Sequence, residues 1–152
     1  MTNTTPPRGM RNNNPLNIRH SASQWQGMRT EQTDRAFVQF TSMTMGYRAA
    51  WRTLETYFKR FEAERKPFTP RNIIYRWAPP VENESEAYLR SICRLTTLAG
   101  NAPLPRPSRI LTSEDKEKLV SLIAAMTCVE NGIKMEAVSK EDIRTAHHLA
   151  FK

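Results

Sequence analysis

The sequence predicts a single, mainly helical α+β domain, and three observations support this fold class. The chain of 152 residues has about the length of one domain, and 39% of its residues are hydrophobic. Its second half holds several segments with apolar residues at three- and four-residue steps, the spacing of amphipathic helices. Most of these segments begin at a residue that can cap a helix N-terminus. We therefore expect one domain over residues 8–152, after a flexible polar start at residues 1–7.

The first part of the domain is predicted to be loop and short strand. Residues 8–30 are rich in Asn, Pro, Ser and Gly and show little helical periodicity, which indicates a structured loop. The segment AFVQF at 36–40 contains several strand formers. Together with NIRH (17–20) and WQGM (25–28), it is expected to form a small β-hairpin or antiparallel sheet.

Two helices are predicted next. Thr41 or Ser42 can cap a long helix whose aromatic stripe recurs at helical spacing. A short helix should then begin at Thr69 and Pro70, because proline favours the first helical position, and Pro79-Pro80 should follow its end.

Three more helices complete the expected fold. Asn83 followed by Glu86 resembles a capping box before the helix EAYLRSICRL. After the proline-rich connection at 99–109, Thr112 or Ser113 should cap a helix over about 114–130, which Gly132 is placed to end. Ser139 should cap the last helix, EDIRTAHHLAF.

The composition restricts the classes of function. A formal net charge of +8 indicates an anionic partner or surface, such as a bacterial cell wall, nucleic acid or acidic lipid. No apolar run is long enough to span a membrane, and MTNTTPPRGM lacks the features of a secretory signal. Cys93 and Cys128 lie in apolar helical patterns, which favours free thiols over a disulfide. No Cys/His spacing indicates a metal, and no cofactor is expected.

Glu130 is the leading candidate for chemistry. It follows Leu119, Ile123 and Met126 at steps of 4, 3 and 4 residues, so it lies on the apolar stripe of its helix. Partial burial and the negative end of the helix dipole both favour a protonated carboxyl, as a general acid requires. The alternative is that Glu130 lies on the rim of the domain and its carboxylate reaches water past Val129.

The stretch RGMRNNNPLNIRHS, residues 8–21, is the second candidate. Asparagines beside a proline are ordinary turn formers, since their amides bind nearby backbone. Four asparagines with three arginines exceed what one turn requires, and amides suit the hydroxyl and N-acetyl groups of sugars. Both interpretations remain open on these residues alone.

Three acids and three tryptophans are further candidates for the site. Glu84 and Glu86 lie at a predicted helix start, where the dipole explains them, whereas Glu82 precedes the cap and is less easily explained. Trp51 lies on the core stripe and Trp77 is expected to do so too. Trp25 is the better candidate for a surface that stacks on a sugar.

Four segments together resemble a family of phage and prophage proteins. These segments are RGMRNNNPLNIR (8–19), WQGM (25–28), FVQFTSMTMGYRAAWRTLETYF (37–58) and IIYRWAPPVENESEAYL (73–89). The family carries the motifs RGIRNNNPGNIR and RWAPPxENxTxxY, and its members are often described as virion structural proteins. This sequence departs from the pattern at Leu16 and at Glu84-Ser85-Glu86, and neither departure removes a proposed catalytic group.

A more distant similarity implies a lysozyme-like fold. NNNPLNIR, FVQFTS and GYRAAWRTL are similar in arrangement to segments of flagellar-type N-acetylglucosaminidases. AAMTCVENG, residues 124–132, resembles the helix-Glu-Ser/Asn-Gly turn of lytic transglycosylases. In those enzymes the acidic helix precedes the asparagine motif, so we expect a circularly permuted order here.

The resemblance implies an enzyme of the lysozyme, glucosaminidase or lytic transglycosylase type that cleaves peptidoglycan strands. Glu130 would be the catalytic acid, with Glu82 as second choice, and the N-acetyl group of the substrate would assist. The residues expected to bind the glycan are Arg8, Arg11, Asn12, Asn13, Asn14, Asn17, Arg19, Trp25, Asn83 and Tyr88. The partner would be peptidoglycan or a related anionic glycan. The protein would be made in the cytoplasm and act at the cell wall, in the periplasm or in a virion, carried by a phage particle or secretion machinery.

Two other functions remain. The chain could be a non-catalytic virion or wall-binding protein on a lysozyme-like scaffold. A nucleic-acid-binding accessory is supported only by the positive charge and lacks a recognisable reading helix or stacking motif.

Overall fold

The mainly helical prediction is confirmed in a computed structural model that describes residues 5–152. The expected flexible segment 1–7 falls partly outside these residues. The helices of the described part are α1 (Arg8–Arg11), α2 (Met43–Ala63), α3 (Pro70–Trp77), α4 (Ser85–Leu95), α5 (Ser113–Asn131) and α6 (Lys140–Ala150), with a 3-10 turn at Met135–Ala137.

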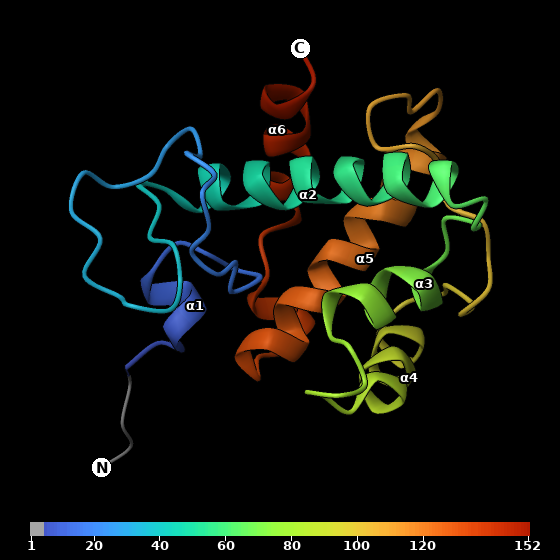
Figure 1. The fold of residues 1–152 in the computed structure, drawn as a ribbon, viewed down its shortest axis with the longest axis horizontal. Helices are drawn as coiled ribbons and strands as arrows, with labels where there is room; N and C mark the ends of the chain where they lie inside the picture. Colours follow the sequence, from blue (N-terminus) through green and yellow to red (C-terminus); the bar gives the residue numbers. More distant parts are fainter. Residues whose placement is uncertain (1–4) are drawn as a thin grey trace.

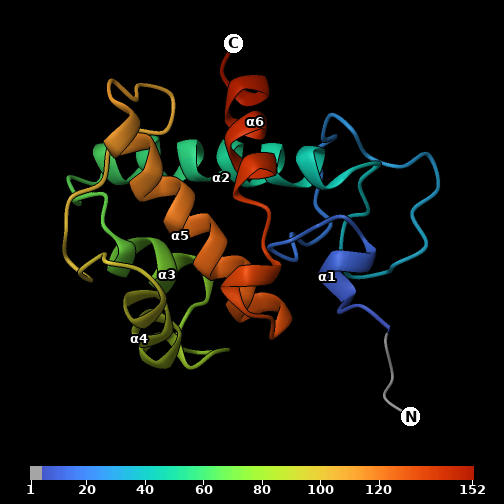
Figure 2. The ribbon, with the colours of Figure 1, turned by 180° about the vertical axis from the view of Figure 1, so that it is seen from behind.

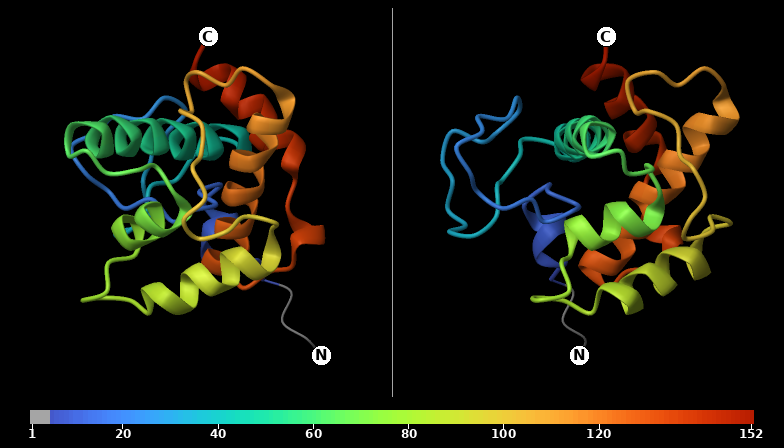
Figure 3. Two further views of the ribbon diagram at one scale, coloured as in Figure 1. Left: turned by 90° about the vertical axis from the view of Figure 1, so that its right-hand side faces the viewer. Right: turned by 45° about the vertical axis from the view of Figure 1, so that its right-hand side comes forward.

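Helix α5 lies at the centre of the molecule (Figures 1 and 2). Every residue from Leu122 to Cys128 is buried, as expected for a helix that is covered on all sides. Helix α2 crosses it on one side, while α3 and α4 lie next to each other on another (Figure 3). This arrangement leaves the C-terminal end of α5 facing the loops that precede α2.

Helix α6 packs across α2, on the side away from α4. The buried indole of Trp51 in α2 donates a 2.8 Å hydrogen bond from Nε1 to the backbone oxygen of Ile143. His147 of α6 lies edge-on to the same ring, and its burial lowers the pKa of the imidazole. These contacts explain why the aromatic stripe of α2 is inside the protein.

Most of the predicted helix starts are observed. The side chains of Ser42, Thr69, Thr112 and Ser139 each accept a hydrogen bond from a backbone N–H three residues later. Gly132 ends α5 with a φ of 62°, in the left-handed region that glycine adopts readily. Local capping chemistry therefore sets these boundaries.

Two predictions about local structure are wrong. The capping box at Asn83 is not formed, because Glu84 is the N-cap residue of α4 and makes no side-chain cap bond. The carboxylate of Glu86 instead pairs with Arg71 at 2.8 Å and accepts a bond from Tyr75. Helix α1 was also not foreseen within the predicted loop.

The expected small sheet is present only as two isolated antiparallel bridges. They pair Arg19 with Phe37 and Met28 with Phe40, so they join the three segments that were predicted to form the sheet. A small second core of Ile18, Val38, Phe40 and Ala49 supports this region. The segments thus meet as expected but do not extend into strands.

Both cysteines are free thiols, with Cys128 buried and Cys93 half-buried. In residues 5–152, none of the helices is both long and apolar enough to cross a bilayer.

Candidate active site: a carboxylate-lined pocket

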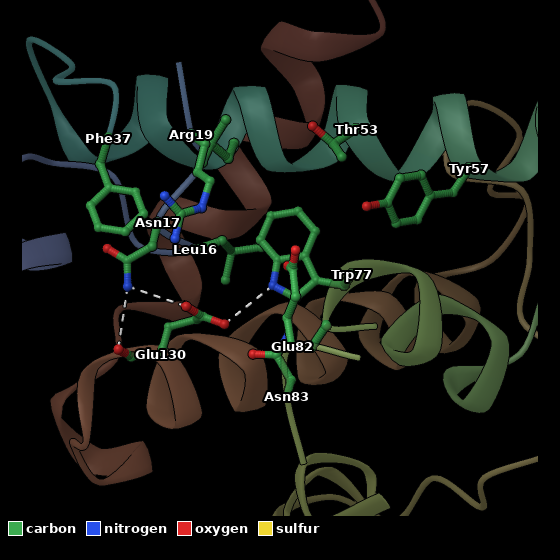
Figure 4. Close-up of a pocket in the computed structure, with 12 residues that line it drawn as sticks. Leu16, Asn17, Arg19, Phe37, Thr53, Tyr57, Trp77, Glu82, Asn83 and Glu130 are labelled. Atoms are coloured by element: carbon green, nitrogen blue, oxygen red, sulfur yellow. Dashed lines mark hydrogen bonds between the residues drawn. The ribbon is translucent and has the colours of Figure 1, made fainter. Parts of the chain in front are cut away.

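A pocket of about 730 Å³ lies between α2 and the ends of α3 and α5 (Figure 4). Each wall comes from a different part of the chain. The lining residues are Leu16, Asn17, Ile18, Arg19 and Phe37 from the loops, Thr53 and Tyr57 from α2, Trp77, Ala78, Glu82 and Asn83 from α3 and the loop after it, and Glu130 from α5.

Glu130 is held by three donors on the floor of this pocket. Its Oε2 accepts hydrogen bonds from the Tyr88 hydroxyl at 2.9 Å and from Trp77 Nε1 at 3.2 Å. Its Oε1 accepts one from Asn17 Nδ2 at 3.2 Å. All three donors are neutral, and no Lys, Arg or His of residues 5–152 forms a salt bridge with this carboxylate. The carboxylate is therefore positioned by the protein without being neutralised by a cation.

The donor hydroxyl of Tyr88 is fixed in its protonated form. Burial raises the pKa of Tyr88 well above its ordinary value, and the adjacent Glu130 raises it further. The Tyr88 hydroxyl therefore keeps its proton and acts as the donor of the hydrogen bond to Oε2.

Asn17 connects the asparagine stretch to the end of α5. Its backbone is left-handed, with a φ of 53°, a conformation that Asn tolerates. The same Nδ2 lies 3.3 Å from the backbone oxygen of Glu130, one of the last carbonyls of the helix, which lack intrahelical partners. One amide thus orients both the helix end and its carboxylate.

The other three asparagines do not line the pocket. Buried Asn14 donates from Nδ2 to the backbone oxygens of Ile18 at 2.9 Å and Val38 at 2.8 Å. Asn12 bonds Asp34 and Gln39, and Asn13 donates to the Phe40 oxygen. The structure gives these amides a structural role in the loop, so among the four only Asn17 reaches Glu130.

The three arginines of the stretch also separate. Arg8 forms a two-pronged pair with Asp34, at 2.7 Å from Nε and 2.6 Å from Nη2. Arg11 donates to the backbone oxygen of Pro6. Arg19 is exposed and lines the pocket, with its guanidinium 5.0 Å from the centre of the Phe37 ring.

The carboxylate of Asp34 accepts hydrogen bonds from Arg8, Asn12 and two backbone N–H groups in the loop before α2. Its charge should therefore make the stability of the fold depend on pH. Arg8, chiefly, holds the pKa of Asp34 well below its usual range, aided by Asn12 and by the backbone N–H groups of Ala36 and Phe37. Because the pKa of Asp34 is lower in the folded protein than the value of about 4 in the unfolded chain, its ionised form stabilises the fold at a pH above about 4. This stabilisation is lost as the pH falls from there towards the folded pKa. We expect Asp34→Asn to lower the melting temperature by several degrees at pH 7, and the difference from wild type to shrink towards pH 2.

The measurement is a series of thermal unfolding curves between pH 2 and 7. Glu31→Gln, an exposed acid in the same loop, serves as the control. Parallel pH profiles for wild type and Asp34→Asn would contradict the assignment.

The remaining predicted residues are placed as follows. Glu82 and Asn83 are exposed and line the pocket on the side of α3. Tyr88 contacts Glu130 rather than lining the pocket itself. Trp25 is half-buried against the small second core and does not line the pocket.

Several residues of the site were not predicted as site residues from the sequence, including the pocket residues Phe37, Thr53, Tyr57 and Trp77, and Gly9 beside Asn17. Trp77, the last residue of α3, packs against the core as expected, and its Nε1 also donates to Glu130, which the sequence did not indicate. Gly9 lies where a Cβ atom would come within 2.5 Å of Asn131 Oδ1 and 2.9 Å of Asn17 Oδ1. Its position directly after the first arginine of the motif was the only signal available for it.

Residues 5–152 contain no group of three or more His, Cys, Asp or Glu side chains placed to hold a metal ion. The acidic and basic side chains that line the pocket are those of Glu130, Glu82 and Arg19.

The fold and the pocket define a mainly helical protein whose central helix ends in a carboxylate facing a polar pocket. No family model matches the sequence. Comparison with curated proteins shows 34% identity over 128 residues to Protein P5 of Pseudoalteromonas phage PM2, covering 82% of this chain and 71% of P5. The chain belongs to the family of this phage protein.

Proposed function

We propose that the protein is a phage- or prophage-encoded enzyme that cleaves the glycan strands of peptidoglycan, with Glu130 as its general acid. The observation that carries the proposal is the setting of Glu130, a carboxylate at the end of a buried helix that faces a pocket and is held only by neutral donors. No cation of residues 5–152 pairs with this carboxylate, and it faces a pocket in which the oxygen of a bound substrate could come within hydrogen-bond reach.

The fold supports a lysozyme-like arrangement in a permuted order. The acid-bearing helix α5 follows the asparagine loop in the sequence, yet Asn17 and Glu130 are in contact across the pocket. We propose that the three segments joined by the two β-bridges correspond to the small sheet of such enzymes. We propose that a circular permutation explains why the acid-bearing helix follows the asparagine motif in this chain but precedes it in the similar enzymes.

In the proposed mechanism, Glu130 protonates the oxygen of the glycosidic bond while the bond from C1 to that oxygen breaks. The N-acetyl oxygen of the same sugar then bonds to C1 and forms a cyclic intermediate. The Glu130 anion left behind is stabilised by Asn17, Trp77 and Tyr88. Glu130 next removes a proton from water or from the C6 hydroxyl of the same sugar. The deprotonated oxygen bonds to C1 while the bond from C1 to the acetyl oxygen breaks and the acetamido group is restored, which gives hydrolysis with water or an anhydro product with the C6 oxygen.

Substrate assistance fits the pocket better than a mechanism with two carboxylates. Glu82 is the other acid in the lining, and it is exposed on the loop after α3. The Glu82 carboxylate forms no salt bridge with any other residue of 5–152 that would hold it in place, whereas a carboxylate nucleophile must be set at a defined separation from the acid. Glu82 is therefore the second choice for the acid and not its partner.

The walls of the pocket suit a sugar chain. Trp77, Tyr57 and Phe37 supply aromatic surface, and Asn17, Asn83 and Thr53 supply donors and acceptors for hydroxyl and acetamido groups. The net charge of +8 favours association with an anionic wall. Action at the cell wall or from within a virion follows from this substrate.

A second function is compatible with the family membership and with the three hydrogen bonds that the Glu130 carboxylate accepts. A phage structural or wall-binding protein could keep the pocket and use the carboxylate only to join α3, α4 and α5. Binding of glycan without cleavage would then be its role.

The deciding experiment is incubation of the wild-type protein with labelled peptidoglycan. Soluble fragments, identified by mass spectrometry as hydrolysed or anhydro ends, would support the enzyme. Sedimentation with the wall and no released fragments would support the second function.

Tyr88→Phe tests whether the hydrogen bonds to Glu130 matter for turnover. The change removes the 2.9 Å bond, and hydrogen bonds to charged groups contribute about 1.5–3 kcal/mol. We expect kcat to fall about tenfold or more, with little change in KM, because Tyr88 acts on Glu130 and does not line the pocket.

The matched control is Tyr75→Phe, since the Tyr75 hydroxyl bonds the exposed Glu86 instead. Initial rates on soluble glycan strands measure both constants. A loss confined to KM, or an equal loss in the control, would count against a positioning role for Tyr88.

A further inference from the structure

Arg19 is the one arginine of the asparagine stretch that is directed at the pocket. In Figure 4 its guanidinium lies on the same side as Asn17 and Phe37, opposite Trp77 and Glu82. Arg8 and Arg19 both lie over the Phe37 ring, at 4.5 Å and 5.0 Å from its centre. The aromatic ring thus holds two cations, one of which faces the pocket.

The two arginines differ in whether an acidic side chain pairs with them. Arg8 is neutralised by the two-pronged contact with Asp34. Arg19 forms no salt bridge with any acid of residues 5–152. The guanidinium of Arg19 is therefore held in position by the ring and keeps its hydrogen-bonding fork available.

We infer that Arg19 forms a carboxylate-binding subsite at one end of the pocket, so that the protein selects acidic sugar strands over neutral ones. The inference rests on the proposed function and specifies its substrate class. Arginine matches a carboxylate with two parallel hydrogen bonds, and Asn17 beside it can contact the sugar that bears the acid.

Peptidoglycan offers this carboxylate from two sources. The stem peptide carries free carboxylates in intact strands. In strands stripped of peptide by an amidase, the lactyl group itself ends in a carboxylate. Chitin oligosaccharides have the same N-acetylated sugar backbone and carry neither acid.

The test compares the affinities of three strands of equal length, namely peptide-bearing, stripped and chitin strands. Affinities are measured in a Glu130→Gln background, so that cleavage does not interfere and the result does not depend on catalysis. Arg19→Gln is expected to reduce the preference for an acidic strand over chitin by about tenfold. A loss on peptide-bearing strands alone assigns the stem peptide, and a loss on stripped strands assigns the lactyl group.

Arg76→Gln is the matched control. Arg76 is also exposed, lies 5.4 Å from the ring centre of the pocket residue Tyr57 and has no salt bridge among the described residues, but it does not line the pocket. The inference is overturned if Arg19→Gln leaves the preference unchanged or if Arg76→Gln lowers it equally. If the wild type binds acidic strands selectively but cleaves none, the proposed function fails while the subsite stands.

Discussion

Replacing Glu130 by glutamine is expected to reduce the release of glycan fragments by about 10²–10⁴-fold, the usual contribution of a general acid. Glutamine has nearly the same shape and can still accept hydrogen bonds from Trp77 and Tyr88, but it cannot protonate the leaving oxygen. Binding to peptidoglycan should persist, because the pocket walls are unchanged. Initial rates of fragment release, together with sedimentation of the protein with the wall, measure the two quantities separately.

The controls identify which carboxylate acts. Glu136→Gln removes an exposed charge from the 3-10 turn just after α5 and should leave the rate within about twofold of wild type. Glu82→Gln tests the second choice for the acid. Full activity of Glu130→Gln with a large loss in Glu82→Gln would move the acid to the loop after α3.

Replacing Gly46 by alanine should cause the largest loss of stability among the changes considered. Gly46 is buried in the first turn of α2, and a Cβ atom there would lie 2.0 Å from the backbone oxygen of Asn13 and 2.7 Å from Pro15 Cδ. Alanine in a helix is ordinarily favoured over glycine by about 1 kcal/mol, so a loss would have the opposite sign to helix propensity. We expect the free energy of unfolding to fall by about 3 kcal/mol or more, since backbone has to move.

Thermal and denaturant unfolding measure this effect, and the melting temperature should drop by about 6–12 °C. Gly100→Ala is the matched control, because the nearest atom to its Cβ would be 3.5 Å away, an ordinary contact. If Gly46→Ala proves as stable as Gly100→Ala, helix α2 and the asparagine loop are not in close contact.

The helices were predictable because their signals are local. Ser42, Thr69, Thr112 and Ser139 each cap the helix that directly follows, and the chemistry of a cap needs only a few neighbouring residues. The capping box at Asn83 failed because Glu86 is bound by residues of α3, a tertiary contact that no local pattern shows. The predicted sheet was reduced to two bridges because side-chain amides such as that of Asn14 bind the backbone oxygens there.

The candidate site was predictable only in part. The spacing on α5 correctly indicated that Glu130 lies at the end of an otherwise buried stripe, half-buried itself. Its partners Trp77, Tyr88 and Asn17 stand 53, 42 and 113 residues away, and no periodicity links such distant positions. The asparagine stretch was correctly singled out as unusual, yet all four of its amides bind the protein itself, and only that of Asn17 reaches Glu130.

The bond between Asn17 and Glu130 also has a consequence for synthesis on the ribosome. The two residues lie 113 positions apart, and buried Asn131 donates to the Pro15 oxygen across 116 positions. A nascent chain therefore exposes the asparagine loop long before the carboxylate that completes the pocket has been translated. A chain that is released before Glu130 has been added contains the loop but lacks the acid. The pocket can therefore form only in chains that extend past this residue.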